Sequence, residues 1–245
     1  MVDADRAVTA EPSRYSELPV RVASALVMVA IAALTLWLGG LVWIGFVLLI
    51  AGLVLWEFNR LVRSSGLSAL GETLWIFFGA IYVSGAALAM IQVRDNYSAV
   101  GVAFIYILPI IAVDVGAYFV GRAVGGPKIA PKLSPSKTWA GLIGGAIGAS
   151  IVTVGVVISG FLPEQLGPGT IPAILMAIGA GALIAVIAQS GDFFESWLKR
   201  RAGVKDSSNL IPGHGGVFDR VDGFLAVFFL VFCVNVLPGL VGGVL

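Results

Sequence analysis

Charged residues, cysteine and histidine are scarce in this 245-residue chain. Only 12% of the residues are charged, whereas 58% are hydrophobic, and the mean hydropathy is +0.99. So little polar surface excludes an ordinary water-soluble domain and predicts an all-α protein that crosses a membrane several times. The single cysteine, Cys233, excludes an internal disulfide and a cysteine-based metal cluster. A net charge of +1 does not indicate a nucleic-acid-binding protein.

Long apolar runs make up most of the sequence. A helix needs about 20 apolar residues to cross a hydrocarbon core of about 30 Å. Gly39 and Gly40 separate the first two apolar runs and could form either a turn between two helices or a kink in one long helix. We expect a turn, because about 40 apolar residues are too many for one span. The predicted fold is a polytopic transmembrane helical bundle of about seven spans, at residues 20–38, 41–61, 74–93, 99–120, 139–162, 171–189 and 223–244.

Small residues recur at four-residue spacing within two of these runs. Gly141, Gly145 and Ala149 follow this spacing in the fifth run, and Ala177 and Gly181 follow it in the sixth. Such a stripe lets helix backbones approach closely in a membrane. We therefore expect these runs to pack tightly against other helices.

Basic residues are distributed unevenly among the segments that connect the runs. If the N-terminus is cytoplasmic, 14 of the 15 Lys and Arg residues fall on the inner side, and Arg94 falls outside. This excess predicts a multi-pass protein of the cell's inner (plasma) membrane with its N-terminus and its active site facing the cytoplasm. We divide the chain into a disordered cytoplasmic tail (1–18), N-terminal transmembrane helices (19–95) and a catalytic transmembrane region (96–245).

Two polar segments of the catalytic region, 121–138 and 192–222, are expected to be cytoplasmic loops. The second contains five acidic residues, five basic residues and the only histidine. Both are rich in Gly, Pro, Lys and hydroxyl groups, which suits donors that surround phosphate oxygens. The lysines of the first loop could instead simply follow the positive-inside rule. His214 fits a phosphate donor, a proton relay or a turn residue equally well.

Acidic residues are paired near the predicted membrane boundary. Asp192 and Glu195 are three residues apart, Asp219 and Asp222 have the same spacing, and Asp114 lies near the inner end of the fourth run. On a helix this spacing places both carboxylates on one face. There they offer hard oxygen ligands to Mg²⁺, whose shell is completed by water and phosphate.

Structural roles compete with metal binding for several acids. Asp222 could cap the last helix, Asp206 could form a turn, and the side chain of Glu57 could extend from the second span to the interface. We favour the structural role for Asp206 and Glu57. For Asp192 and Asp219, metal or phosphate chemistry is the better interpretation because each lies beside a Gly-containing segment and a basic residue.

The order of these motifs resembles a known family. Ser-Trp-Leu-Lys-Arg at 196–200, Lys205-Asp206 and Ile-Pro-Gly-His-Gly-Gly-Val-Phe-Asp-Arg-Val-Asp at 211–222 are similar to the signature of phosphatidate cytidylyltransferases, the CDP-diacylglycerol synthases. Residues 114–118, 134–141 and 189–196 fit the same pattern, so the resemblance covers roughly the last 130 residues. The chain departs at Ser136, where relatives often carry a second lysine, and at Ala140, where they often carry an acid.

The resemblance implies that CTP and phosphatidic acid react to give CDP-diacylglycerol and pyrophosphate, with Mg²⁺ as cofactor and the number of cations left open. Asp192 and Asp219 would bind the metal, with Asp222 and Asp114 as second choices or supporting partners. The residues implied to act in catalysis are Asp192, Asp219, Lys137 and Arg220, and those implied to bind substrate are Ser134, Ser136, Thr138, Lys199, Arg200, Lys205 and His214.

Two rival functions stay open at this point. A cation-coupled transporter would also carry membrane acids in Gly-rich helices, but it predicts charges near the bilayer midplane and an inverted repeat. A CDP-alcohol phosphotransferase would begin its motif as Asp219, Asp222 and Gly223 do, but the rest of that motif is absent from the sequence. The expected partners are CTP, phosphatidic acid and membrane lipids, not nucleic acid, and a homodimer is neither required nor excluded.

Overall fold

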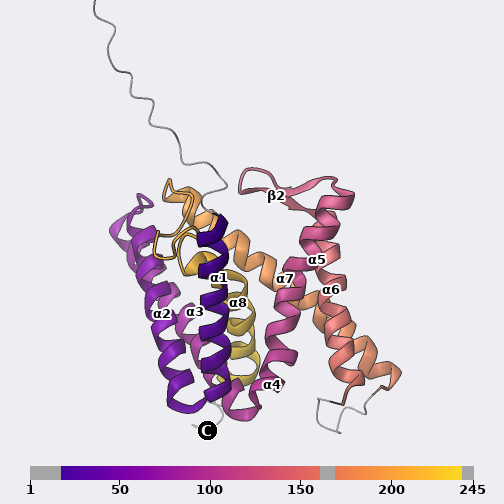
Figure 1. Ribbon diagram of the computed structural model, residues 1–245. Coiled ribbons are helices and arrows are strands. Elements are labelled where there is room, and N and C mark those ends of the chain that lie inside the picture. The colour runs from indigo at the N-terminus through magenta and orange to yellow at the C-terminus, as the bar shows by residue number, and fades with distance from the viewer. Residues whose placement is uncertain (1–17, 161–168, 239–245) are drawn as a thin grey trace, which may run out of the picture.

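The computed structural model describes residues 18–160 and 169–238, and helices make up most of it (Figure 1). The predicted tail lies outside the described residues except for its last one. In chain order the elements are α1 (Leu18–Leu38), α2 (Gly40–Arg63), α3 (Ala69–Asn96), α4 (Ala99–Val102), the π-helix η1 (Ala103–Ile107), α5 (Leu108–Val124), β1 (Lys128–Ala130), β2 (Ser134–Thr138), α6 (Trp139–Ile158), α7 (Ile171–Arg201), α8 (Phe218–Val231) and the π-helix η3 (Phe232–Val236).

Six helical segments in the described part of the chain are long and apolar enough to cross a membrane. They are α1, α2, α3, the continuous segment from α4 to α5, α6 and α7. The all-α polytopic fold expected from the sequence is therefore confirmed. The seventh predicted run, 223–244, falls on α8 and η3, and its last residues lie outside the described ranges.

The first two apolar runs form two helices joined by a tight turn, as expected. Gly39 and Gly40 have φ angles of 64° and 52°, a conformation that glycine adopts without steric cost. Arg94 of α3 closes this turn by donating to the carbonyl oxygens of Leu36 (2.8 Å) and Trp37 (3.4 Å), which the end of α1 leaves unpaired. The basic residue that was expected on the outer side thus caps α1.

Close packing of small residues joins α5, α6 and α7. A Cβ atom on Gly145 would lie 2.9 Å from the carbonyl oxygen of Val113, and one on Gly141 would lie 3.2 Å from that of Ala117. A Cβ on Gly181 would similarly lie 2.5 Å from the backbone of Ser150. The predicted packing stripe is therefore confirmed, and it leaves no room for larger side chains between these helices.

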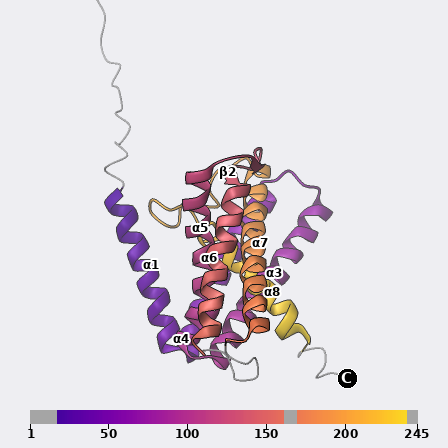
Figure 2. The ribbon, with the colours of Figure 1, turned by 90° about the vertical axis from the view of Figure 1, so that its right-hand side faces the viewer.

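The remaining helices form a second group around α2, α3 and α8, and α7 packs against α8 to connect the two groups. In Figure 1, α7 crosses the bundle obliquely toward the end that carries the β-hairpin. Figure 2 shows α1 at the edge of the bundle, away from α6 and α7. Only 6% of the apolar window of α1 is buried, so this helix faces its surroundings along most of its length.

The first polar segment is a β-hairpin rather than a simple loop. Strand β1 pairs antiparallel with β2, with Lys128 opposite Thr138 and Ala130 opposite Ser134. Figure 1 shows the hairpin extending over the end of the bundle where α7 terminates. No strand was predicted here because the hairpin is short and rich in Pro, Lys and Ser, which strands disfavour.

The second polar segment, 192–222, is not one loop. Residues 192–201 continue α7, residues 218–222 begin α8, and the connection between the helices is limited to 202–217. The helix therefore continues 12 residues beyond the predicted end of the sixth apolar run at residue 189, and residues 192–201, which were expected in a loop, are helical. Its charged residues did not end the helix because they pair with charges from neighbouring elements, as the site shows.

Candidate active site

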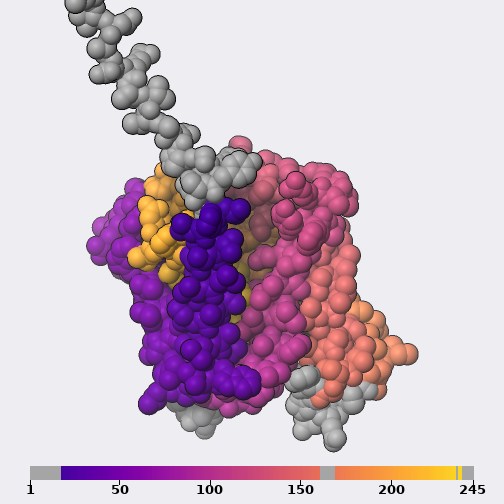
Figure 3. Space-filling model, viewed as in Figure 1, coloured from indigo at the N-terminus to yellow at the C-terminus, as the bar shows by residue number. Residues whose placement is uncertain are grey.

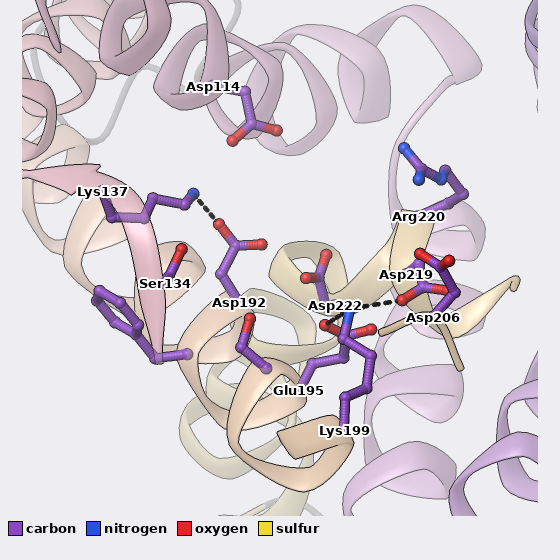
Figure 4. A pocket seen from close by; sticks show the side chains of 12 residues that line it. Asp114, Ser134, Lys137, Asp192, Glu195, Lys199, Asp206, Asp219, Arg220 and Asp222 are labelled. Carbon is purple, nitrogen blue, oxygen red and sulfur yellow. Dashed lines mark hydrogen bonds and ion pairs between the residues drawn. The ribbon is translucent and has the colours of Figure 1, made fainter. Parts of the chain in front are cut away.

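A cavity of about 350 Å³ lies where α7 and α8 meet below the β-hairpin (Figure 4). Six carboxylates and three cationic side chains line it, so we call it the acidic cavity. Its carboxylates come from α5, α7, the connection between α7 and α8, and α8. The full lining is Asp114, Ser134, Lys137, Asp192, Phe193, Glu195, Ser196, Lys199, Asp206, Asp219, Arg220 and Asp222.

An ion pair connects the β-hairpin to α7 at one side of this cavity. Lys137 of β2 reaches across to Asp192, and about a quarter of each side chain is exposed. Figure 4 shows Asp114 of α5 facing this pair. Burial alone would lower the pKa of Lys137, but the charge of Asp192 outweighs it and raises the pKa above its usual value. Lys137 is therefore a permanently charged group inside the cavity.

A second lysine connects α7 to α8. Lys199 donates to Glu195 (2.7 Å), one turn earlier in α7, and to Asp219 of α8 (2.6 Å). Asp219 also accepts hydrogen bonds from the backbone and hydroxyl of Ser207 (both 2.9 Å) and from the backbone of Gly216 (2.8 Å). Burial would raise the pKa of Asp219, but these donors outweigh it and hold the pKa well below its usual range.

The α7–α8 crossing brings the carboxyl groups of Asp192 and Asp222 into the same cavity. Gly191 makes this approach possible, because a Cβ there would lie 2.5 Å from the carbonyl oxygen of Asp222. Asp222 lies inside α8, which begins at Phe218, so it is not the N-cap of the last helix. Two carboxylates that face the same cavity repel one another unless a proton or a cation lies between them.

The donor set fits a hard cation such as Mg²⁺. Asp192 and Asp222 face the same cavity, and beside them Glu195 is 2% exposed and its Oε1 has no hydrogen-bond partner in the described structure. Carboxylate oxygens are the ligands that Mg²⁺ prefers. No three acidic, His or Cys side chains within residues 18–160 and 169–238 converge closely enough to form a metal site as they stand. Asp192 and Asp219 form ion pairs with Lys137 and Lys199 instead. Metal binding by Asp192, Asp219, Asp222 and Asp114 therefore stays a prediction.

Glu57 is a structural centre of the site, and the prediction that it extends to the interface was wrong. Its side chain is fully buried and accepts hydrogen bonds from the hydroxyls of Ser207 (3.1 Å) and Ser208 (2.5 Å). It also accepts from the backbone N–H groups of Val217 (3.0 Å) and Phe218 (2.6 Å), at the beginning of α8. Glu57 therefore fixes the connection that presents Asp219.

A second cavity of about 510 Å³ lies beside the first, and Asp206 and Arg220 line both. We call it the basic cavity because its lining contains three cationic side chains, two of which, Arg21 and Lys205, do not line the acidic cavity. The charged residues of its lining are Arg21, Lys205, Asp206 and Arg220, and the others are Asn209, Ile211, Pro212, Gly213, His214 and Gly215.

His214 lies in a turn that holds the basic cavity together. Its backbone N–H donates to Ile211 (2.9 Å), and its carbonyl oxygen accepts two hydrogen bonds from the guanidinium of Arg220 (2.7 and 3.0 Å). Its ring Nδ1 lies 2.9 Å from the hydroxyl of Ser24 in α1. The backbone of His214 therefore acts as a turn residue, and its ring connects the signature segment to the first helix.

Known proteins share the part of the chain that builds this site. Residues 64–237 match the cytidylyltransferase family, which is more than half of the chain. The chain belongs to this family. Three relatives named phosphatidate cytidylyltransferase are 40% identical over 159 residues (Brucella melitensis), 30% over 229 residues (Rickettsia bellii) and 36% over 187 residues (Bacillus subtilis).

The extent of these matches differs between relatives. They cover 64%, 92% and 75% of this family member, and 56%, 94% and 65% of the respective relatives. The chain thus spans little more than half the length of the Brucella relative. The family match includes the β-hairpin, α7 and α8 but begins after Glu57 and Arg21. Two residues that shape the site in this family member therefore lie outside the matched range.

The structure brings most of the predicted site residues together. Asp114, Ser134, Lys137, Asp192, Lys199, Asp219, Arg220 and Asp222 line the acidic cavity, and Lys205 and His214 line the basic cavity.

Three predicted substrate-binding residues lie elsewhere. Thr138 is 3% exposed and caps α6 by accepting from the backbone of Gly141 (3.0 Å). Ser136 and Arg200 are exposed and line neither cavity. Sequence reasoning paired Glu195 with Asp192 but did not count it among the site residues, and it missed Arg21 as a lining residue. The available signal for Arg21 was a charge next to apolar neighbours.

Proposed function

We propose that this protein transfers the cytidylyl group of CTP to phosphatidic acid, giving CDP-diacylglycerol and pyrophosphate. The observation that carries the proposal is the acidic cavity, which lies at one end of a bundle of membrane-length helices and contains two lysines that each pair with an aspartate. The family and the names of the relatives support the same reaction. A lipid can keep its chains beside apolar helices while its phosphate reaches this end.

In the proposed reaction, an oxygen of the phosphate monoester attacks the α-phosphorus of CTP. A new P–O bond forms as the bond from the α-phosphorus to the bridging oxygen breaks, and pyrophosphate leaves with that electron pair. Both reactants are anions, so Lys137, Lys199 and Arg220 would reduce their repulsion and stabilise the departing charge. No protein nucleophile is needed.

Mg²⁺ is the cofactor that this donor set would take. Asp192 and Asp219 would hold it, and Asp222 and Asp114 would complete or support the shell. When bound, the cation would neutralise phosphate charge and stabilise the leaving group. Lys137 and Lys199 already neutralise the first two carboxylates, so they would be released to contact phosphate oxygens as the cation binds.

We further propose that the cavities face the cytoplasm in the inner membrane, as the distribution of Lys and Arg predicts. A cysteine at Asn209, beside the basic cavity, and a cysteine at Asn96, at the end of α3, would report on the two sides in a Cys233→Ala background. An impermeant thiol reagent added to intact cells should label position 96 and spare position 209. The opposite pattern would reverse the orientation.

The decisive experiment follows the label of [α-³²P]CTP in purified protein with phosphatidic acid and Mg²⁺. We expect label to enter the organic phase, with one pyrophosphate released per labelled lipid. Diacylglycerol in place of phosphatidic acid should give no labelled lipid, because it lacks the attacking phosphate. Pure, folded protein that forms no labelled lipid under these conditions would overturn the proposed function.

A further inference from the structure

The two cavities have opposite charge although they share a wall. Six acidic and three basic residues line the acidic cavity, whereas three basic residues and one acidic residue line the basic cavity. A cation-dependent nucleotide site suits the first environment. The second attracts an anion that brings no metal with it, because the cationic excess itself supplies the counter-charge.

The basic cavity lies at the end of a helix that faces the membrane. Arg21, in the second turn of α1, lines it, and one turn later Ser24 contacts both the ring of His214 and the carbonyl oxygen of Pro212 (3.3 Å). Further along α1, Leu26 and Val29 are 66% and 67% exposed. The same helix therefore presents an apolar surface to hydrocarbon and a cation to the cavity.

An opening beside α1 leads from that apolar surface toward the site. Figure 3 shows a hollow between α1 and α5, where the interior of the bundle is visible behind the two helices. α1 packs on α2 and touches α4 at its far end, and α5 packs on α6 and α7. A molecule with long apolar chains could therefore lie in this hollow with its polar end at the level of Arg21.

We propose that the basic cavity binds the phosphate monoester of the lipid substrate, and that Arg21 of α1 is one of its ligands together with Lys205 and Arg220. The proposal rests on the proposed cytidylyl transfer, since it assigns the acceptor to one cavity and the nucleotide to the other. Arg220 lines both cavities, which places the monoester beside the phosphorus that it attacks. Arg21 belongs to α1, which lies outside the family match, and through it the first helix would supply part of the lipid site.

Steady-state kinetics in mixed micelles would test this assignment. We expect Arg21→Ala to raise the apparent KM for phosphatidic acid by about tenfold or more, as expected for loss of a charged hydrogen bond, and to leave the KM for CTP within about twofold. Lys205→Ala should act in the same direction without touching α1. Arg63→Ala, an exposed arginine at the same end of the bundle that lines neither cavity, should change neither constant. Arg21→Ala and Lys205→Ala variants with an unchanged KM for phosphatidic acid, or a raised KM for CTP, would overturn the assignment.

A binding measurement separates this inference from the proposed reaction. In the absence of CTP, short-chain phosphatidic acid should raise the unfolding temperature of the wild-type protein but not of Arg21→Ala, and short-chain diacylglycerol should raise neither. This result without turnover would retain the lipid-phosphate site and reject the reaction. Stabilisation by CTP or pyrophosphate that depends on Arg21 would instead assign the basic cavity to the nucleotide and overturn the inference. Stabilisation of both proteins alike by phosphatidic acid would also overturn it.

Discussion

Replacing Glu57 should lower both the stability of the protein and its activity, although Glu57 lines neither cavity. Its carboxylate accepts four hydrogen bonds, and two of the donors are backbone N–H groups at the beginning of α8 that cannot turn away. A buried donor left without a partner costs about 1–3 kcal/mol. Glu57→Ala should therefore destabilise the protein by about 2–6 kcal/mol from the two backbone groups alone.

The unfolding temperature in detergent would measure this loss. For a chain of this size, 1 kcal/mol corresponds to about 2–4 °C, so Glu57→Ala should lower the midpoint by on the order of 10 °C. Glu57→Gln keeps one acceptor oxygen and should lose roughly half as much. Glu72→Ala, a partly exposed glutamate in the first turn of α3, is the control and should cost no more than about 1 kcal/mol.

Activity would show whether Glu57 also positions Asp219. The hydroxyl of Ser207 lies between their two carboxylates, so loss of Glu57 should loosen Asp219 even where the protein stays folded. Well below the midpoint, Glu57→Gln should retain binding of CTP but turn over about tenfold more slowly, because a small misplacement of a reacting group has a large effect on rate. A Glu57→Ala variant with a normal midpoint and normal turnover would refute this reasoning.

Three further predictions concern the acidic cavity. Asp192→Asn and Asp219→Asn should each lower turnover on the order of a thousandfold while the protein remains folded, and near-normal turnover at saturating Mg²⁺ would remove that residue from the site. Lys137→Ala should lower cytidylyl transfer by about ten- to a thousandfold, whereas Lys128→Ala, exposed on β1, should have little effect; equal mild losses would make the hairpin a charged linker. Gly191→Ala should separate α7 from α8 and abolish the stabilisation of the protein by Mg²⁺, and an unchanged Mg²⁺-dependent midpoint would contradict the role assigned to that contact.

The sequence predicted the helical bundle well because its signal is strong and local. Each apolar run is long enough to form a helix by itself, and the hydrocarbon length sets how long it must be. Gly39 and Gly40 marked the first turn for the same local reason. The stripe of Gly141 and Gly145 likewise indicated a close helix contact, although it did not indicate which helix would be the partner.

The sequence predicted which residues form the site, but it did not predict how they pair with one another. Residues 192–222 carried the correct chemical groups, yet their helical part was not recognised because partners distant in sequence neutralise its charges. Lys137 is 55 residues from Asp192, and Ser207 is 150 residues from Glu57. Thr138 was expected to bind substrate, but its hydroxyl serves as the N-cap of α6. Local patterns cannot specify such tertiary pairings.

The crossing of α7 and α8 has a consequence for how the protein is made. During translation α7 emerges before α8, so Glu195 and Lys199 reach the membrane before Asp219 exists to pair with them. Glu195 and Lys199 can pair with each other within α7 (2.7 Å). A charged pair without surrounding protein is still costly inside hydrocarbon, where a single charge costs about 2.5–3.5 kcal/mol at the centre of a helix. We therefore expect the polar end of a nascent α7 to stay at the membrane surface until residues 218–222 arrive, which makes completion of the catalytic site a late event in membrane insertion.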